Sequence, residues 1–77
     1  MNKIKIANII NEICNEKEYK LIDPNSDEFL NLNLRNDIGF DSFDLAQLTV
    51  MIEDEFDVDI FKDGIILTIG EIVQKLG

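Results

Sequence analysis

The sequence predicts an all-α protein, a small bundle of three to four helices with a long loop between helices 1 and 2. Three observations indicate this fold class. Apolar residues recur at intervals of three and four in three separate stretches, as they do along one face of a helix. Of the 77 residues, 45% are hydrophobic and only one is proline, a composition that favours folding over disorder. A chain this short is expected to form one domain, residues 1–77, with a thin core.

The first predicted helix covers residues 2–16. Its apolar side chains fall on one face at spacings of three and four: Ile6, Ile9, Ile10, Ile13 and Cys14. A single cysteine means that the fold does not rely on disulfides. Because Cys14 lies on the apolar face without a basic neighbour placed to lower its pKa, we expect a buried hydrophobe and not a reactive thiol.

Residues 17–41 predict a long connection. The stretch "DPNSDE" at 23–28 has turn chemistry around the only proline. Apolar residues nevertheless continue through the connection, so we expect it to lie across the core, with one short helical turn near 26–30. Long loops inside compact domains are unusual and often functional.

The second helix, residues 42–56, has the clearest pattern. Leu45, Leu48, Ile52 and Phe56 recur at three, four and four, and Asp44 lies in the first turn, where the helix dipole favours a negative charge. A turn is predicted at 62–64, and the segment 61–67 is short enough for a third helix to be reduced to a turn.

The last helix is expected to begin after Thr68. This threonine is a candidate N-cap, and Glu71 lies three residues on, the spacing of a capping box. An apolar face follows, formed by Ile69, Ile72, Val73 and Leu76.

The net charge of -9 limits the possible partners. Sixteen acids stand against seven bases, which argues against nucleic-acid binding and against anionic membrane surfaces. A basic protein partner is the better expectation. Between residues 36 and 61 every charged residue is acidic: Asp37, Asp41, Asp44, Glu53, Asp54, Glu55, Asp57 and Asp59. The absence of a leader pattern and of any segment of membrane-spanning length predicts a cytoplasmic protein.

Metal and acid–base sites are weakly supported by the acidic residues. With Asp59 at position one of a calcium-binding loop, Asp63 and Gly64 fit positions five and six, but Phe61 and Gly70 occupy positions three and twelve, which require oxygen ligands. No metal site is therefore predicted. Paired carboxylates for acid–base catalysis are less favoured than a solvated helix face, and the absence of histidine excludes His-based triads and imidazole bases.

Ser42 has two competing interpretations. A serine at the start of a helix is most often a cap or a first-turn residue without chemistry. It also fits an attachment point, because a phosphodiester formed there would face backbone N–H groups and the positive end of the helix dipole. It does not fit a catalytic nucleophile, since there is no histidine and no lysine close in sequence to act as base. The dipeptide Asp41–Ser42 alone favours the first interpretation.

The wider stretch "DIGFDSFDLAQLTVMIEDEFDVDI", residues 37–60, resembles the acyl carrier protein family. That family carries Asp-Ser-Leu at the start of its second helix, then spaced leucines and an acidic run before Phe. Asp41 and Ser42 match this signature, and Phe43 stands for the usual leucine. The core positions Leu48, Ile52, Phe56 and Ile60 and the acidic run Glu53, Asp54 and Glu55 also match. A weaker likeness extends over the rest of the chain.

The resemblance implies a carrier that is not itself an enzyme. A phosphopantetheinyl transferase would attach 4'-phosphopantetheine from coenzyme A to Ser42, which Asp41 flanks, and the thiol of this arm would hold an acyl group as a thioester. Acyl-loading and acyl-transferring enzymes with basic docking surfaces would then bind the second helix of a monomeric carrier. The candidate partner-binding residues are Asp41, Phe43, Asp44, Gln47, Val50, Met51, Glu53 and Asp54.

Two alternatives remain open from the sequence. One is an aminoacyl carrier of the peptidyl or D-alanyl type, with the same serine and fold but a different cargo. The other is a non-carrier, an acidic helical interaction module in which Ser42 has no modification. Gln47 stands where fatty-acid carriers usually have an acid, so a specialised pathway is at least as well supported as fatty-acid synthesis.

Overall fold

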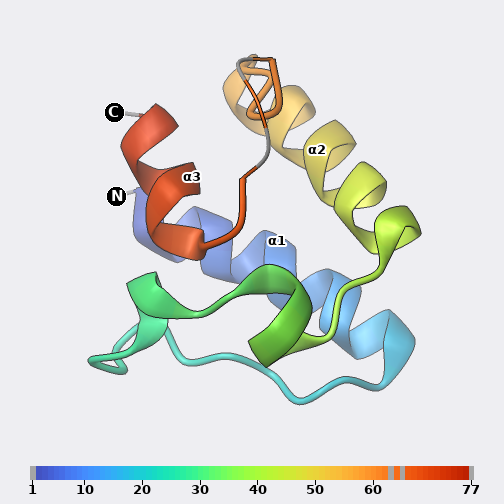
Figure 1. Ribbon diagram of the computed structural model, residues 1–77, viewed down its shortest axis with the longest axis vertical. Coiled ribbons are helices and arrows are strands. Elements are labelled where there is room, and N and C mark those ends of the chain that lie inside the picture. The colour runs from blue at the N-terminus through green and yellow to red at the C-terminus, as the bar shows by residue number, and fades with distance from the viewer. Residues whose placement is uncertain (1, 63, 65, 77) are drawn as a thin grey trace.

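The computed structural model describes residues 2–62, 64 and 66–76. It confirms the all-α prediction, since the described residues form helices and connections without a strand. The α-helices are α1 (Asn2–Lys17), α2 (Ser42–Phe56) and α3 (Ile69–Leu76), and two short helices, η1 (Phe29–Asn31) and η2 (Leu34–Ile38), lie in the long loop. Figure 1 shows α2 and α3 on opposite sides of the molecule and the loop doubling back along α1. The predicted starts of α1 and α2 and the end of α2 are confirmed.

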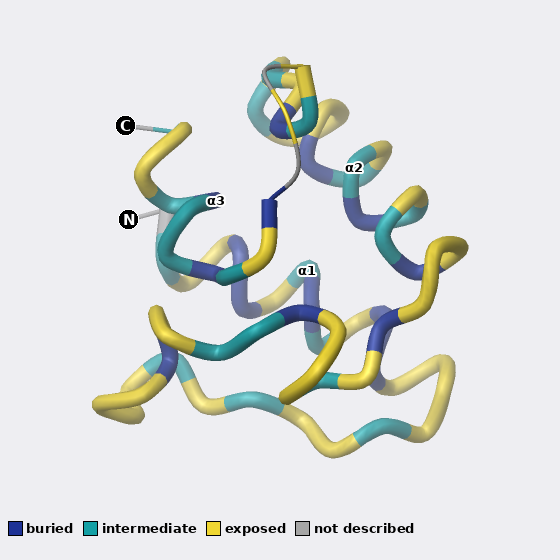
Figure 2. The backbone as a smooth tube through the Cα atoms, in the orientation of Figure 1, coloured by how far each residue is buried: buried dark blue, intermediate teal, exposed yellow. Residues whose placement is uncertain are grey.

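The core is formed by one face of each α-helix together with side chains from the connections. Figure 2 shows buried segments on the inner sides of the helices and along the loop. From α1 the core receives Ile6, Ile10, Ile13 and Cys14, and the cysteine is fully buried, as predicted; Ile9 is half-buried and packs against the core. From the loop it receives Phe29, Leu34 and Phe40. The long connection therefore lies across the core, as its apolar residues predict.

Polar contacts fix the loop in place. The side chain of Asn11 on α1 makes two hydrogen bonds to the backbone of Ile22: its Nδ2 donates to the carbonyl at 3.0 Å, and its Oδ1 accepts from the N–H at 2.7 Å. Further along, the N–H of Leu34 donates to Leu67 at 2.8 Å and the N–H of Ile69 donates to Leu32 at 3.1 Å. The loop is thus tied to α1 and to the start of α3.

η2 is a turn of π-helix that the sequence analysis did not predict. The Asn33 side chain caps it by accepting from the N–H groups of Arg35 and Asn36, and the Asp37 carboxylate accepts from the Asn33 N–H at 2.7 Å. Gly39 ends the turn with a φ of 98°, a left-handed conformation in which glycine carries no penalty. The predicted helical turn near 26–30 corresponds to η1, which begins three residues later than expected.

The segment between α2 and α3 contains no helix among its described residues. Turns close from Lys62 to Asp59 and from Gly64 to Phe61, so the turn predicted at 62–64 begins earlier; Asp63 lies outside the described residues. Thr68 caps α3 by accepting from the Glu71 N–H at 3.3 Å, as predicted. The Glu71 carboxylate accepts from Leu67, one residue before the position that a capping box requires.

Candidate functional site

Ser42 is the first residue of α2, and Asp41 is its N-cap. The Asp41 carboxylate accepts from the Asp44 N–H at 2.9 Å, and the Asp44 carboxylate accepts in return from the Asp41 N–H at 3.2 Å. This reciprocal capping box satisfies backbone donors that the first turn would otherwise leave unpaired. Ser42 is therefore not the cap. It is exposed, and its hydroxyl makes no hydrogen bond with any residue that the structure describes.

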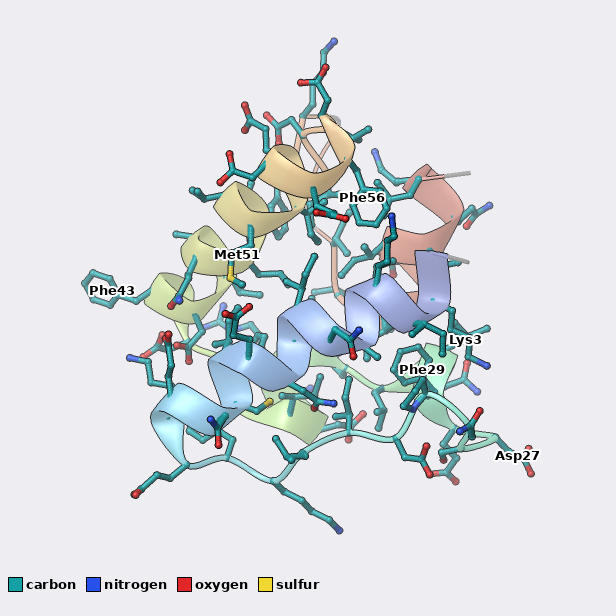
Figure 3. The ribbon with its side chains drawn as sticks, turned by 180° about the vertical axis from the view of Figure 1, so that it is seen from behind. Lys3, Asp27, Phe29, Phe43, Met51 and Phe56 are labelled. Carbon is teal, nitrogen blue, oxygen red and sulfur yellow. The ribbon has the colours of Figure 1, made fainter. Side chains whose placement is uncertain are left out.

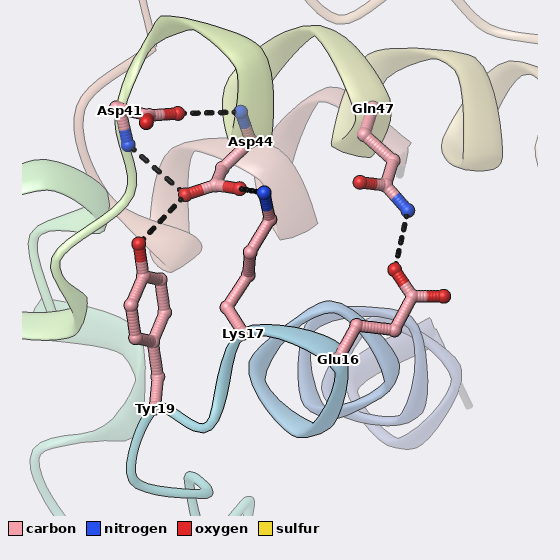
Figure 4. Close-up of polar contacts among 6 residues, drawn as sticks. All are labelled: Glu16, Lys17, Tyr19, Asp41, Asp44 and Gln47. Carbon is pink, nitrogen blue, oxygen red and sulfur yellow. Dashed lines mark hydrogen bonds and ion pairs between the residues drawn. The ribbon is translucent and has the colours of Figure 1, made fainter.

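Asp44 does not lie on the protein surface. Its side chain is fully buried and points toward the end of α1, where the Tyr19 hydroxyl donates to Oδ2 at 3.2 Å and the Lys17 ammonium lies 3.7 Å from Oδ1. Figure 4 shows both residues converging on this carboxylate. The prediction that Asp44 binds partners is therefore wrong, because a buried and paired carboxylate is not available to a docking protein. Sequence analysis missed Lys17 and Tyr19, and no local pattern links them to Asp44.

Three side chains in or beside the capping box have shifted pKa values: Asp41, Tyr19 and Cys14. The backbone N–H of Asp44 holds the pKa of Asp41 below its ordinary value, because this hydrogen bond favours the ionised carboxylate. Burial raises the pKa of the Tyr19 phenol, and its hydrogen bond to Asp44 adds to this effect. Burial also raises the pKa of the Cys14 thiol, and the charge of Asp44 acts in the same direction. Tyr19 and Cys14 therefore keep their protons at neutral pH and provide no base.

A shallow hollow of about 300 Å³ lies beside Ser42. Its lining comes from η2, from one face of α2 and from the turn that follows it: Arg35, Ser42, Leu45, Ala46, Thr49 and Phe61. The Thr49 hydroxyl donates to the Leu45 carbonyl at 2.9 Å, so its hydrogen is already engaged by the helix backbone. The hollow is thus largely apolar, with two hydroxyls and a guanidinium on its lining.

The outer face of α2 carries most of the other predicted partner-binding residues. Phe43 is 82% exposed and Val50 is 60% exposed; Figure 3 shows Phe43 projecting away from the helix. Asp41, Glu53 and Asp54 are exposed as well. Gln47 and Met51 are only half-buried, and the Gln47 amide donates to Glu16 on α1 at 3.1 Å. Apart from Asp44, the predicted residues thus form an exposed or half-exposed surface.

Neither a group of metal ligands nor a membrane-spanning helix is found among the described residues. Within residues 2–62, 64 and 66–76, no three acidic or cysteine side chains are grouped to hold a metal ion. Asp63, which the calcium-loop interpretation would require, lies outside this range. In the same part of the chain, no helix has both the length and the apolar character that crossing a membrane requires.

Comparisons with known proteins agree with this geometry. The family model described as "Phosphopantetheine attachment site" matches residues 5–76. An acyl carrier protein of Amoebophilus asiaticus (strain 5a2) is 41% identical over 49 residues. This alignment covers 61% of the present chain and 61% of the relative, so the match spans about three fifths of that protein's length. No solved structure matches the chain.

Proposed function

Because the chain belongs to the phosphopantetheine attachment site family, that of the acyl carrier proteins with their covalent 4'-phosphopantetheine, we propose that it carries acyl intermediates on an arm at Ser42. The single observation that supports this most strongly is the position of Ser42. It is an exposed first-turn residue whose cap is supplied by its neighbour Asp41, which leaves the hydroxyl available for a phosphoester bond.

The residues around Ser42 fit the phosphodiester of such an arm. The first turn of α2 presents backbone N–H groups and the positive end of the helix dipole, which favour an anion. The hollow beside Ser42 leaves room for the arm to pass along α2. The chain's other serine, Ser26, is less suitable, because its hydroxyl accepts from the Glu28 N–H within a loop turn and it begins no α-helix.

The chain's own contribution is to hold Ser42 in a fixed direction. The capping box sets the start of α2, and Tyr19 and Lys17 anchor the box to α1. When Ser42 Oγ forms its bond to phosphorus, the pyrophosphate bond of coenzyme A breaks and the adenosine bisphosphate leaves. The base that takes the serine proton is assigned to the transferase, because the neighbouring Asp41 carboxylate is engaged by the Asp44 N–H and its pKa lies below the ordinary value. The bound arm supplies a thiol that holds the cargo as a thioester.

The partners proposed are a phosphopantetheinyl transferase and acyl-loading and acyl-transferring enzymes. The docking surface consists of exposed and half-exposed residues of the start and outer face of α2: Asp41, Phe43, Gln47, Val50, Met51, Glu53 and Asp54. Its acids would steer basic partners and raise the association rate more than lasting affinity, which suits a carrier that must dock briefly with several enzymes. The exposed Phe43 and Val50 supply apolar contact.

Intact-mass measurement tests this proposal. With coenzyme A and a phosphopantetheinyl transferase, the wild-type protein should gain the mass of one phosphopantetheine. Ser42→Ala should gain none, while the matched variant Ser26→Ala should be modified normally. A modified Ser42→Ala protein, or a wild type that resists several transferases, would contradict the proposal. Offering acyl and aminoacyl donors to the modified protein then decides between an acyl cargo and the aminoacyl alternative.

A further inference from the structure

Arg35 is a cation placed beside the proposed attachment point. It is the only basic residue between positions 21 and 61, and it lines the same hollow as Ser42. Its side chain is exposed, and none of the carboxylates that the structure describes forms an ion pair with it. The nearby Asp37 instead accepts a hydrogen bond from the Asn33 N–H at 2.7 Å. The guanidinium is therefore open to an anion.

The local backbone holds Arg35 in position. The Asn33 side chain accepts from the Arg35 N–H at 2.9 Å, which fixes the start of η2, and Gly39 ends the turn in the left-handed conformation. Two residues later Asp41 begins the capping box of α2. The residue that carries the guanidinium and the one that carries the hydroxyl are thus set by one short, hydrogen-bonded segment.

A phosphodiester on Ser42 would need such a cation. Asp41 precedes Ser42, and its lowered pKa keeps its carboxylate charged, so it repels a second negative charge. The dipole of α2 offsets part of this repulsion. Arg35 would offset more, because the planar guanidinium can donate two parallel hydrogen bonds to phosphate oxygens.

We infer that Arg35 binds the phosphodiester of the arm on Ser42 and directs the arm along the hollow, an inference that rests on the proposed function. The hollow is lined by positions 42, 45, 46 and 49 of α2. At 3.6 residues per turn, Phe43, Val50 and Asp54 lie on a different face of the helix. An arm held by Arg35 would therefore leave Phe43, Val50 and Asp54 uncovered, whereas Glu53 lies in line with the hollow and closer to the arm.

The test is ³¹P NMR of the modified protein. The wild type, Arg35→Gln, Arg35→Lys and a charge-matched control, Lys3→Gln, are each converted with coenzyme A and transferase. Lys3 lies beside Phe29, across the molecule from Phe43 in Figure 3. We expect Arg35→Gln to move the ³¹P resonance toward that of free phosphopantetheine, Arg35→Lys to move it less, and Lys3→Gln to leave it unchanged. Added salt should move the wild-type resonance in the same direction as Arg35→Gln.

The outcomes separate this inference from the function on which it rests. If the mass increases by one phosphopantetheine but the resonance is the same in wild type and Arg35→Gln, the inference is wrong and the proposed function stands. An equal shift in Arg35→Gln and Lys3→Gln would also overturn it, because net charge would then be the cause. If no mass is gained, both fail. Circular dichroism checks that each variant is folded. If Arg35→Gln does not fold, Arg35→Lys takes its place in the test, because it keeps the positive charge but loses the planar guanidinium.

Discussion

The two ends of α2 carry the same kind of residue in opposite surroundings. At the start, Asp44 is fully buried, and its Oδ2 accepts hydrogen bonds from the Asp41 N–H and the Tyr19 hydroxyl. The Lys17 ammonium forms an ion pair with Oδ1 at 3.7 Å, and Oδ1 accepts no hydrogen bond from the described residues. Toward the end, Glu53 and Asp54 are exposed, and the ion pair of this acidic run joins the neighbouring Glu55 to Lys5 at 3.4 Å. An aspartate in the first turn therefore belongs to the interior, and an aspartate in the last turns belongs to the surface.

Because of this difference, buried and exposed acids of α2 should have different roles, one in folding and the other in partner recognition. A buried carboxylate contributes to folding through each hydrogen bond and charge that it receives, and its removal leaves those donors unpaired. An exposed carboxylate contributes little to folding, since water and salt screen it, but it remains available to a partner. Asp44 at the start of α2 should thus affect the free energy of unfolding, and Glu53 and Asp54 near its end should affect association.

The largest expected effect is that of removing the buried carboxylate. Asp44→Ala leaves the Tyr19 hydroxyl, the Lys17 ammonium and the Asp41 N–H without their partner, and we expect it to lower the free energy of unfolding by about 2 kcal/mol. The matched variant Asp54→Ala removes an exposed carboxylate and should change this free energy by less than about 0.5 kcal/mol. Urea denaturation followed by circular dichroism measures both. Equal losses in the two variants would show that the ends of α2 do not differ in this way.

Tyr19→Phe tests one contact of the buried carboxylate, because it removes only the hydroxyl that donates to Asp44. The pKa of Tyr19 is raised in the folded protein, so the neutral phenol is favoured by folding. Its contribution to stability is fully present below the ordinary tyrosine pKa of about 10 and is lost as the pH rises through the raised folded pKa. We therefore expect wild type to be more stable than Tyr19→Phe from pH 6 to 9, with the difference shrinking at higher pH.

The measurement is the difference in urea midpoint between the two proteins from pH 6 to pH 11. Both contain the same lysines and acids, so their titration affects the two curves alike. A difference that stays constant up to pH 11, or one that grows, would mean that the phenol does not donate to Asp44 in solution. The double variant with Asp44→Ala should remove most of the effect of Tyr19→Phe, because the two residues contribute through one shared hydrogen bond.

Local patterns predicted most of the helices, and the candidate site only in part. The bounds of α2 follow from apolar spacing and from residues that adjoin it, so short-range sequence is sufficient. η2 depends on hydrogen bonds from the side chains of Asn33 and Asp37 to the backbone. Such bonds do not change the spacing of apolar residues, so the sequence pattern does not reveal them. The burial of Asp44 depends on Tyr19, 25 positions earlier. Such a contact arises only when the loop has folded back onto α1.

Substitutions near the end of α2 should change stability least and association with partners most. Replacing Glu53 and Asp54 together by lysine reverses two exposed charges in a strongly acidic region. The change in free energy of unfolding should stay within about 0.5 kcal/mol for each residue, and its sign should favour the variant, since less like charge is gathered there. If these acids steer basic enzymes, modification of Ser42 by the transferase should be slower and less sensitive to salt.

The control is a second pair of adjacent exposed acids, Asp27 and Glu28, replaced in the same way. Asp27 lies on the other side of the molecule from Phe43 and Met51 in Figure 3, so the control changes the net charge equally without touching the outer face of α2. Initial rates of modification at low and high salt compare the two variants. Equal slowing would assign the effect to net charge, and wild-type rates in both would mean that recognition depends on neither pair of acids. Slowing confined to the Glu53 and Asp54 variant would show that this end of α2 serves docking, while Asp44 at the other end serves folding.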